Sequence, residues 1–135
     1  MFVDASAIVA ILNSEAEAVT FADALERSAS RVTSPIAIFE ATLALCRVRH
    51  ATVEQAAADI AEFLELADVR CAPIAEQDAQ VALMAFARYG KGRGHPAQLN
   101  LGDCFAYAAA RGQNVPLLFK GDDFTKTDIE PAVPA

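Results

Sequence analysis

The chain opens on Met1-Phe2-Val3-Asp4-Ala5-Ser6-Ala7-Ile8-Val9-Ala10, and this stretch decides the fold class. Residues 1–3 are an apolar run that stops at Asp4, which predicts a short buried strand, and a helical pattern follows from Ser6. Further strands are predicted at 31–33, 69–74 and 115–119, with helical patterns between them. Apolar strands that alternate with helices are typical of a parallel sheet covered by helices on both faces. We therefore predict an α/β chain.

The predicted helices begin at recognisable capping residues. Ser34 precedes Pro35, and Thr52 precedes Gln55 by three residues, a spacing that predicts a capping box. Asn100 is predicted to cap a helix that stops at Gly112. The glycine-containing stretch 90–100 is predicted to be a loop. The expected helices span 6–12, 15–27, 35–50, 52–67, 76–89 and 101–111, and the absence of repeats and linkers predicts one domain over 1–135.

Composition excludes several classes of protein. The chain has 135 residues, of which 54% are hydrophobic and 21% charged, which excludes a disordered or collagen-like protein. The formal net charge of −7 argues against a protein that coats DNA by bulk attraction. No apolar run reaches the roughly 18 residues of a membrane span, and no basic leader opens the chain, so we expect a cytoplasmic protein. Three cysteines without a CxxC pair predict free, buried thiols, with neither a disulfide framework nor a zinc site.

Acidic residues recur where a parallel sheet builds its sites, beyond the carboxyl ends of the strands. Asp4 ends the first predicted strand, Asp122 follows the last one, and Asp103 lies in the first turn of the helix opened by Asn100. Each has a structural alternative. Asp4 can serve as a helix cap, Asp103 can complement a helix dipole, and Asp122 can be a turn residue.

Glu40 is the acid that a structural role explains least well. Its helical neighbours Ile36, Leu43 and Ala44 are apolar, and no Lys or Arg lies within one turn. A buried carboxylate needs a cation or a shifted pKa, because an unpaired buried charge costs several kcal/mol. Acids that converge on one point repel each other, and a divalent cation relieves that repulsion. Oxygen ligands favour Mg²⁺ or Mn²⁺, and such centres serve phosphodiester chemistry.

Four segments together resemble the PIN-domain ribonucleases, and more narrowly the VapC toxins of type II toxin–antitoxin modules. They are the opening 2–10, the helix that carries Glu40, the segment 99–108 (Leu-Asn-Leu-Gly-Asp-Cys-Phe-Ala-Tyr-Ala) and the run 116–124 (Pro-Leu-Leu-Phe-Lys-Gly-Asp-Asp-Phe). The resemblance covers essentially the whole chain. It implies a three-layer α/β/α sandwich around a parallel sheet of four or five strands, and a metal-dependent endoribonuclease.

The resemblance also implies roles for individual acids. The family's acids fall on Asp4, Glu40 and Asp103, and a fourth falls on Asp122 or Asp123, of which we favour Asp122 because it is nearer to the strand. The expected metal is Mg²⁺, with Mn²⁺ possible. Ser6 is expected to support Asp4 by hydrogen bonding, and Asn100 is likewise expected to support the acids without contacting the metal ion.

Further expectations concern partners. Because the net charge is acidic for an RNA enzyme, local basic residues must steer the substrate, and the candidates are Lys91, Arg93, His95 and Lys120. The resemblance implies a homodimer and a VapB-like antitoxin whose C-terminal segment covers the helices between residues 6 and 67. DNA would be bound only indirectly, through the antitoxin, and no membrane is involved.

Other functions fit the sequence less well. A PIN-fold nuclease outside a toxin–antitoxin system keeps the same acids. A metal-dependent phosphatase or phosphotransferase would want Asp-x-Asp after the first strand, where this chain has Asp4-Ala5-Ser6. A phospho-accepting receiver domain would need an aspartate at the end of a mid-chain strand, and a PIN fold that only binds proteins would not need the intact acid set.

Overall fold

The computed structural model describes residues 1–134 and has at its centre a four-stranded sheet. The strands are β1 (Phe2–Val3), β2 (Val32–Thr33), β3 (Arg70–Cys71) and β4 (Leu117–Leu118), and all pairs are parallel in the order β3-β2-β1-β4. Phe2 is in register with Val32 on one side and Leu117 on the other. The predicted parallel sheet is confirmed, with β1 in its interior.

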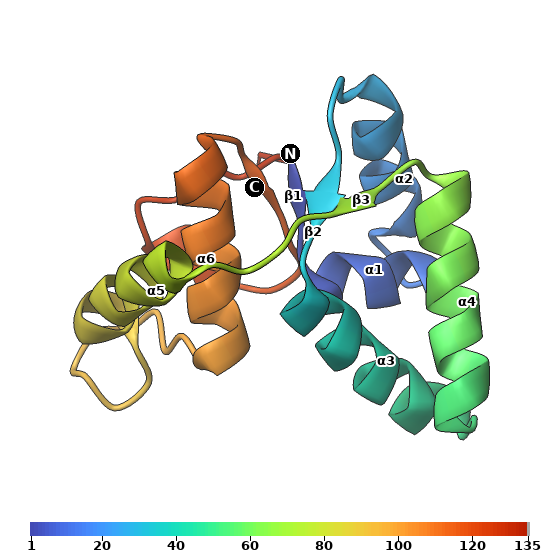
Figure 1. The fold of residues 1–135 in the computed structure, drawn as a ribbon, viewed down its shortest axis with the longest axis horizontal. Coiled ribbons are helices and arrows are strands. Elements are labelled where there is room, and N and C mark those ends of the chain that lie inside the picture. The colour runs from blue at the N-terminus through green and yellow to red at the C-terminus, as the bar shows by residue number, and fades with distance from the viewer. Residues whose placement is uncertain (135) are drawn as a thin grey trace.

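Helices cover the sheet from two sides. Figure 1 shows α5 and α6 together on one side and the helices α1 to α4 on the other. The helices are α1 (Ala5–Leu12), α2 (Ala18–Arg27), α3 (Pro35–Arg49), α4 (Val53–Leu66), α5 (Glu76–Tyr89) and α6 (Leu101–Gln113), and a short 3-10 helix, η1 (Phe124–Lys126), follows β4. The three-layer sandwich expected from the sequence is thereby confirmed.

The core explains why the central strands are short and wholly apolar. Phe2, Val3, Leu117 and Leu118 are completely buried between the two helical layers. Strands covered on both faces need no alternation of apolar and polar residues. Ile8, Leu45 and Ile60 fill the side of α1, α3 and α4, so one hydrophobic cluster extends through the described chain.

The predicted caps are present. Ser34 Oγ accepts the Ala37 N–H at 3.1 Å, Thr52 and Gln55 form the predicted capping box, and Asn100 caps α6. These side chains accept hydrogen bonds from backbone N–H groups at the helix N-termini that have no partner within the helix.

Several predicted boundaries were wrong. Helix α2 begins at Ala18 and not at Glu15. Helix α6 continues through Gly112 to Gln113 and is capped by Asn114, whose φ is 52°. The segment 69–74 was predicted as a strand, but within it only Arg70 and Cys71 pair, and they form an exposed edge. Cys71 is accordingly exposed, contrary to the expected burial of the thiols, while Cys104 is buried.

The loop from α5 to α6 is closed at its base. Gly90 and Leu99 form a bridge, the Lys91 N–H donates to the Leu99 carbonyl, and the Leu99 N–H donates to the Tyr89 carbonyl. Gly92 and Gly94 both have φ of 82°, a left-handed conformation that favours glycine. No helix within residues 1–134 combines the length and apolarity needed to cross a bilayer.

Candidate active site

Asp4 lies at the carboxyl end of the buried strand β1, where it caps α1. Its side chain is only 5% exposed, and its Oδ2 accepts the Ser6 N–H at 3.1 Å and the Ser6 hydroxyl at 2.5 Å. The Ser6 Oγ in turn accepts the Lys120 N–H at 3.0 Å, which ties Asp4 to the chain beyond β4. Burial raises the pKa of Asp4, and the hydrogen bonds from Ser6 oppose that rise.

Asp103 is held by the first turn of α6. Its backbone N–H donates to Asn100 Oδ1 at 2.9 Å, and its Oδ2 accepts the Asn100 N–H at 3.0 Å. This reciprocal pair fixes the side chain at the helix N-terminus. Burial raises the pKa of Asp103 to about 6; the Asn100 N–H opposes the rise, and the negative charges of Asp4 and Asp123 add to it.

Glu40 enters the same region from α3. Its carboxylate lies so close to Gly102 that a Cβ at position 102 would overlap it. Burial, followed by the charges of Asp4 and Asp103, raises the pKa of Glu40 to about 7. The structure therefore brings together Asp4, Glu40 and Asp103, from the end of β1, from α3 and from α6. They are close enough that Asp4 raises the pKa of both other acids and Asp103 raises that of Glu40.

The two acids after β4 differ in their surroundings. Asp123, at the start of η1, is near enough to raise the pKa of Asp103. Asp122 lies in the exposed turn before it, where its carbonyl accepts the Thr125 hydroxyl at 2.5 Å. Of the two candidates for the fourth acid, Asp123 is the one whose charge raises the pKa of Asp103.

The cluster has an excess of negative charge. Among residues 1–134, none of the ion pairs involves Asp4, Glu40 or Asp103. As arranged here, no group of three or more His, Cys, Asp or Glu side chains in that range is ready to hold a metal ion. The donors are nevertheless all carboxylate oxygens, which suit Mg²⁺ or Mn²⁺, and the acids that repel one another have no other cation to separate them. The residue types fit such an ion, and side-chain rotation would be needed to enclose it.

Gly102 is a functional position that the sequence analysis did not identify. It lies in the first turn of α6 between Leu101 and Asp103, and its missing side chain leaves the space that the Glu40 carboxylate occupies. A signal was available, because glycine inside a helix costs about 0.5–1 kcal/mol relative to alanine and usually has a reason.

The predicted basic residues are in different situations. Lys91 and Arg93 are exposed in the closed loop. His95 is fixed by the protein, since its Nδ1 accepts the Ala97 N–H at 3.0 Å and its ring packs edge-on against Tyr89. The Lys120 ammonium lies 2.5 Å from Glu15 and 3.3 Å from Glu17, so two carboxylates compensate its charge.

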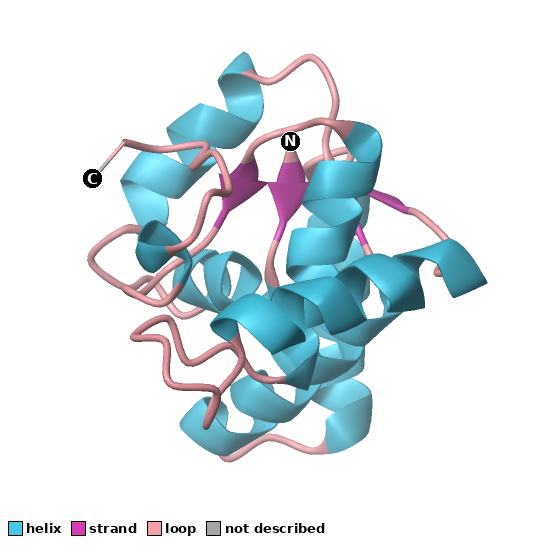
Figure 2. Cartoon of the chain, turned by 90° about the vertical axis from the view of Figure 1, so that its left-hand side faces the viewer, coloured by secondary structure: helices cyan, strands magenta, loops and turns pink. Residues whose placement is uncertain are grey.

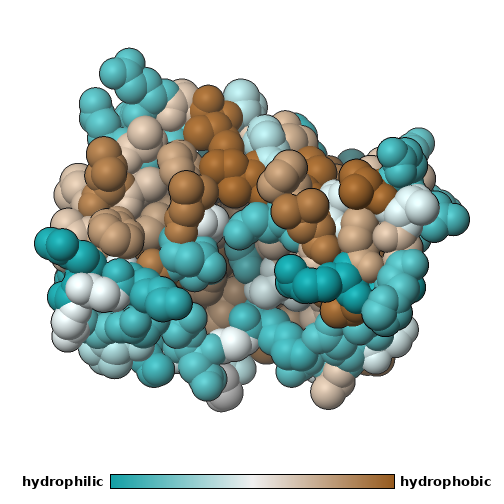
Figure 3. Space-filling model, turned by 90° about the horizontal axis from the view of Figure 1, so that it is seen from below, coloured by the Kyte–Doolittle hydropathy of each residue, from teal (hydrophilic) through white to brown (hydrophobic). Residues whose placement is uncertain are grey.

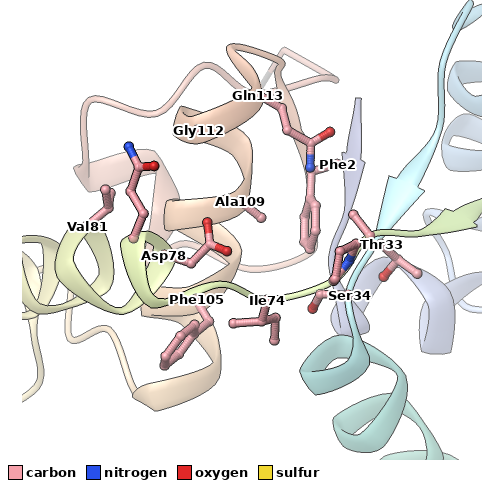
Figure 4. A pocket seen from close by; sticks show the side chains of 13 residues that line it. Phe2, Thr33, Ser34, Ile74, Asp78, Val81, Phe105, Ala109, Gly112 and Gln113 are labelled. Carbon is pink, nitrogen blue, oxygen red and sulfur yellow. The ribbon is translucent and has the colours of Figure 1, made fainter.

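A cavity of about 220 Å³ lies elsewhere, between the sheet and the helices α5 and α6. Figure 4 shows Phe2, Thr33 and Ser34 on one side of it and Phe105 and Ala109 on the other. The hydroxyls at its edge are already used: Thr33 donates to the Val3 carbonyl, and Ser34 caps α3. None of the candidate acids lines this cavity.

Apolar side chains are exposed around the acids. An open groove between α3 and α6 is lined by Phe39, Glu40 and Leu101, and a second groove between α5 and α6 is lined by Leu83 and Phe86. Phe39, Leu83 and Leu101 are 64%, 69% and 67% exposed. Figure 3 shows apolar side chains gathered over one half of the face seen from below.

Comparisons with known proteins agree with this geometry. The PIN domain family matches residues 1–130. The chain is 40% identical over 133 residues to ribonuclease VapC28 of Mycobacterium tuberculosis, covering 98% of both chains. It is 42% identical over 139 residues to VapC ribonuclease R02377 of Rhizobium meliloti, covering 95% of this chain and 98% of the relative. The crystal structure of VapC20 of M. tuberculosis, a sarcin-ricin loop cleaving toxin, matches with a TM-score of 0.74 at 18% identity, over 95% of each chain.

Proposed function

The chain belongs to the PIN domain family and, within it, to the VapC ribonucleases, and on this basis we propose that it is an endoribonuclease toxin that hydrolyses RNA phosphodiester bonds. The observation that carries the proposal is the convergence of Asp4 at the end of β1, Glu40 in α3 and Asp103 in α6, with the Glu40 carboxylate packed against Gly102 beside Asp103. Carboxylates whose pKa values are raised by burial and by a neighbouring negative charge are unfavourable for stability, and they are expected where chemistry requires them.

The proposed cofactor is Mg²⁺, with Mn²⁺ as a substitute. Asp4, Glu40 and Asp103 would hold it, and Asp123 is proposed as the fourth acid in place of Asp122, because Asp123 acts on Asp103. A divalent cation in such a site supplies positive charge to phosphate oxygens and lowers the pKa of a bound water. With the cation bound, the attraction of each carboxylate to the ion would outweigh the repulsion between the carboxylates.

The remaining residues of the site have positioning roles in this proposal. Ser6 fixes one carboxylate oxygen of Asp4 through two hydrogen bonds, and Asn100 orients Asp103 through the capping box. Gly102 keeps space for Glu40. Lys91 and Arg93 are proposed to attract the RNA backbone, whereas Lys120 contributes less because Glu15 and Glu17 neutralise it.

Partners are proposed from the exposed apolar surface. A cytoplasmic VapB-like antitoxin would cover apolar side chains near the acids, and a homodimer would cover others, since patches of this kind mark interaction sites. An arginine from the antitoxin could pair with the acid cluster and compete with the metal ion. DNA would be reached only through the antitoxin.

The test is cleavage of end-labelled RNA by the purified protein. We expect cleavage with Mg²⁺ or Mn²⁺, none with EDTA, and none by Asp4→Asn, which keeps the size and the cap acceptor of Asp4 but removes its charge. The matched control is Asp23→Asn, an exposed aspartate on α2 that pairs with Arg27. Cleavage that persists in EDTA or in Asp4→Asn would refute the proposed site.

A further inference from the structure

A second charged cluster lies at the other end of α6 and has the opposite sign. Its cations are Arg88, near the end of α5, and Arg111, near the end of α6. Among residues 1–134, Asp128 is the only acid that forms an ion pair with either of them. In a chain of net charge −7, this is a local excess of positive charge.

The two arginines share one carboxylate. Asp128 Oδ2 accepts the Arg111 Nη2–H at 2.8 Å and lies 3.6 Å from Arg88 Nη1, while Oδ1 accepts the Tyr107 hydroxyl at 2.6 Å. The guanidinium of Arg88 also lies over the Tyr89 ring at 4.8 Å, and that of Arg111 lies over Tyr107 at 5.7 Å. These contacts restrain the side chains, so less entropy is lost when they bind an anion.

The arginines keep free binding capacity. Each guanidinium carries five N–H donors, and a single carboxylate oxygen serves both. The side chains of Arg88 and Arg111 are 66% and 51% exposed. One negative charge between two positive ones leaves a net positive charge that faces solvent, as a phosphate-binding site requires.

The pair is connected to the acid cluster along one ridge. Asp103, Tyr107 and Arg111 are spaced four residues apart on α6, so they follow one another along its surface. The segment 123–128 lies beside this row, with Asp123 acting on Asp103 and Asp128 bound to Tyr107 and Arg111. Figures 1 and 2 show the α5–α6 loop and the segment after β4 on the same side of the molecule.

We propose that Arg88 and Arg111, held together by Asp128, bind a phosphate of the RNA backbone away from the bond that is cut. Eight residues at 1.5 Å per residue separate Arg111 from Asp103 along α6, about 12 Å. The bound phosphate therefore belongs to a nucleotide near the scissile one and not to the scissile phosphate itself. This inference rests on the proposed function, since it names a further contact with the same substrate.

The experiment measures RNA binding apart from cleavage. Fluorescence anisotropy of a labelled single-stranded RNA is recorded over a range of salt concentrations in the Asp4→Asn background, with R88Q/R111Q added. Each phosphate neutralised on single-stranded nucleic acid contributes about 0.7 to the slope of log affinity against log salt, so losing one phosphate contact should make the slope shallower by about 0.7. The matched control is R27Q/R70Q, which removes two exposed arginines from α2 and β3 and should leave the slope unchanged.

Two more variants separate charge from folding. R88K/R111K keeps both charges and should retain the slope, and thermal melts report whether each variant is folded. An unchanged slope in folded R88Q/R111Q, or an equal change in R27Q/R70Q, overturns the proposal. The proposal is also overturned if R88Q/R111Q loses binding to a polyglutamate peptide that the parent protein binds but keeps its affinity for RNA. That result would assign the two arginines to an acidic protein partner.

The outcome also distinguishes this inference from the function beneath it. If the wild-type protein cuts RNA and the Asp4→Asn protein binds it, but R88Q/R111Q has the parental slope, only the arginine site is refuted. If the wild-type protein neither cuts nor binds RNA, the proposed function fails, and this inference fails with it.

Discussion

The aspartates at the two ends of α6 have opposite electrostatic surroundings. At its first turn Asp103 lies near Asp4 and Glu40 with no cation paired to them in the described chain, and its pKa is raised to about 6. Near its last turn Asp128 lies between a tyrosine hydroxyl and two arginines, which hold its pKa below the ordinary value. The helix dipole at the N-terminus of α6 favours the charged form of Asp103 and so lowers its pKa, but burial and the nearby negative charges raise that pKa by more.

This contrast separates structural acids from functional ones. Asp128 is surrounded by donors and cations, so its charge stabilises the fold. Asp4, Glu40 and Asp103 accept few hydrogen bonds and lie beside one another. Their negative charges therefore lower the stability of the metal-free fold. A site that is unfavourable by itself and favourable with a divalent cation is what a metal-dependent enzyme requires.

The largest expected effect comes from removing a charge at the acid end. Asp103→Asn should lower the rate of RNA cleavage at least about 100-fold, equivalent to about 2.7 kcal/mol of transition-state stabilisation. The asparagine can still accept the Asn100 N–H, so the melting temperature of the metal-free protein should be unchanged or raised. Initial rates and thermal melts measure both. A large loss of melting temperature would mean that the charge of Asp103 serves the fold, as that of Asp128 does.

A smaller effect distinguishes the two acids after β4. Asp123→Asn should slow cleavage about tenfold, or about 1.4 kcal/mol, because Asp123 interacts with Asp103. Asp122→Asn is the matched control and should have little effect. The reverse order in a side-by-side rate measurement would restore Asp122 as the fourth acid.

At the arginine end the expected effect is on stability. Asp128→Asn should lower the free energy of unfolding by about 1 kcal/mol, because it weakens the bonds to Tyr107 and Arg111 at a partly exposed site. Since the pKa of Asp128 is lowered in the folded state, its contribution is present above its ordinary value of 3.8 and is lost as pH falls through the folded-state pKa. Urea denaturation at neutral and acidic pH tests this. A contribution that grows on acidification would contradict it.

The smallest effect is the opposite pH dependence at the acid end. Folding raises the pKa of Glu40 from 4.5 to about 7, so its favourable contribution is present below 4.5 and is lost as pH rises through about 7. In EDTA, Glu40→Gln should therefore be at least as stable as the wild type near neutral pH, with a weaker decline of stability as pH rises. Urea midpoints measured across this range provide the test, and a clearly destabilised variant would show that the charged carboxylate has a stabilising partner.

Local signals in the sequence predicted much of the architecture. Pro35 after Ser34, the Thr52–Gln55 box and Asn100 each act within one turn, so the starts of α3, α4 and α6 were predictable. The end of α6 was not, because Gly112 is accommodated in the helix and Asn114 supplies the left-handed cap. The start of α2 was misplaced since Glu15 and Glu17 bind Lys120, a residue more than 100 positions away.

The candidate site was predictable to the extent that it depends on strand ends and caps. Asp4 and Asp103 were predicted as candidates because Asp4 follows the first strand and Asp103 lies in the first turn of a capped helix, and both are positions where parallel α/β folds place site residues. The close approach of Glu40 to Gly102 and the choice between Asp122 and Asp123 depend on how α3, α6 and the turn after β4 pack together. Arg88, Arg111 and Asp128 are far apart in the sequence, and only the packed α5, α6 and C-terminal segment bring them together.

The closed base of the α5–α6 loop has a consequence for engineering. Because Gly90 and Leu99 are bridged and Leu99 is completely buried, the chain enters and leaves the loop at nearly the same point. A peptide inserted after Gly92, with Lys91 and Arg93 kept, would extend outward from that point without shifting Asn100 or the helix that it caps. The tip of this loop is therefore a natural insertion point for an affinity tag or a fluorescent label in a protein whose Met1 and Pro131 both lie beside the sheet.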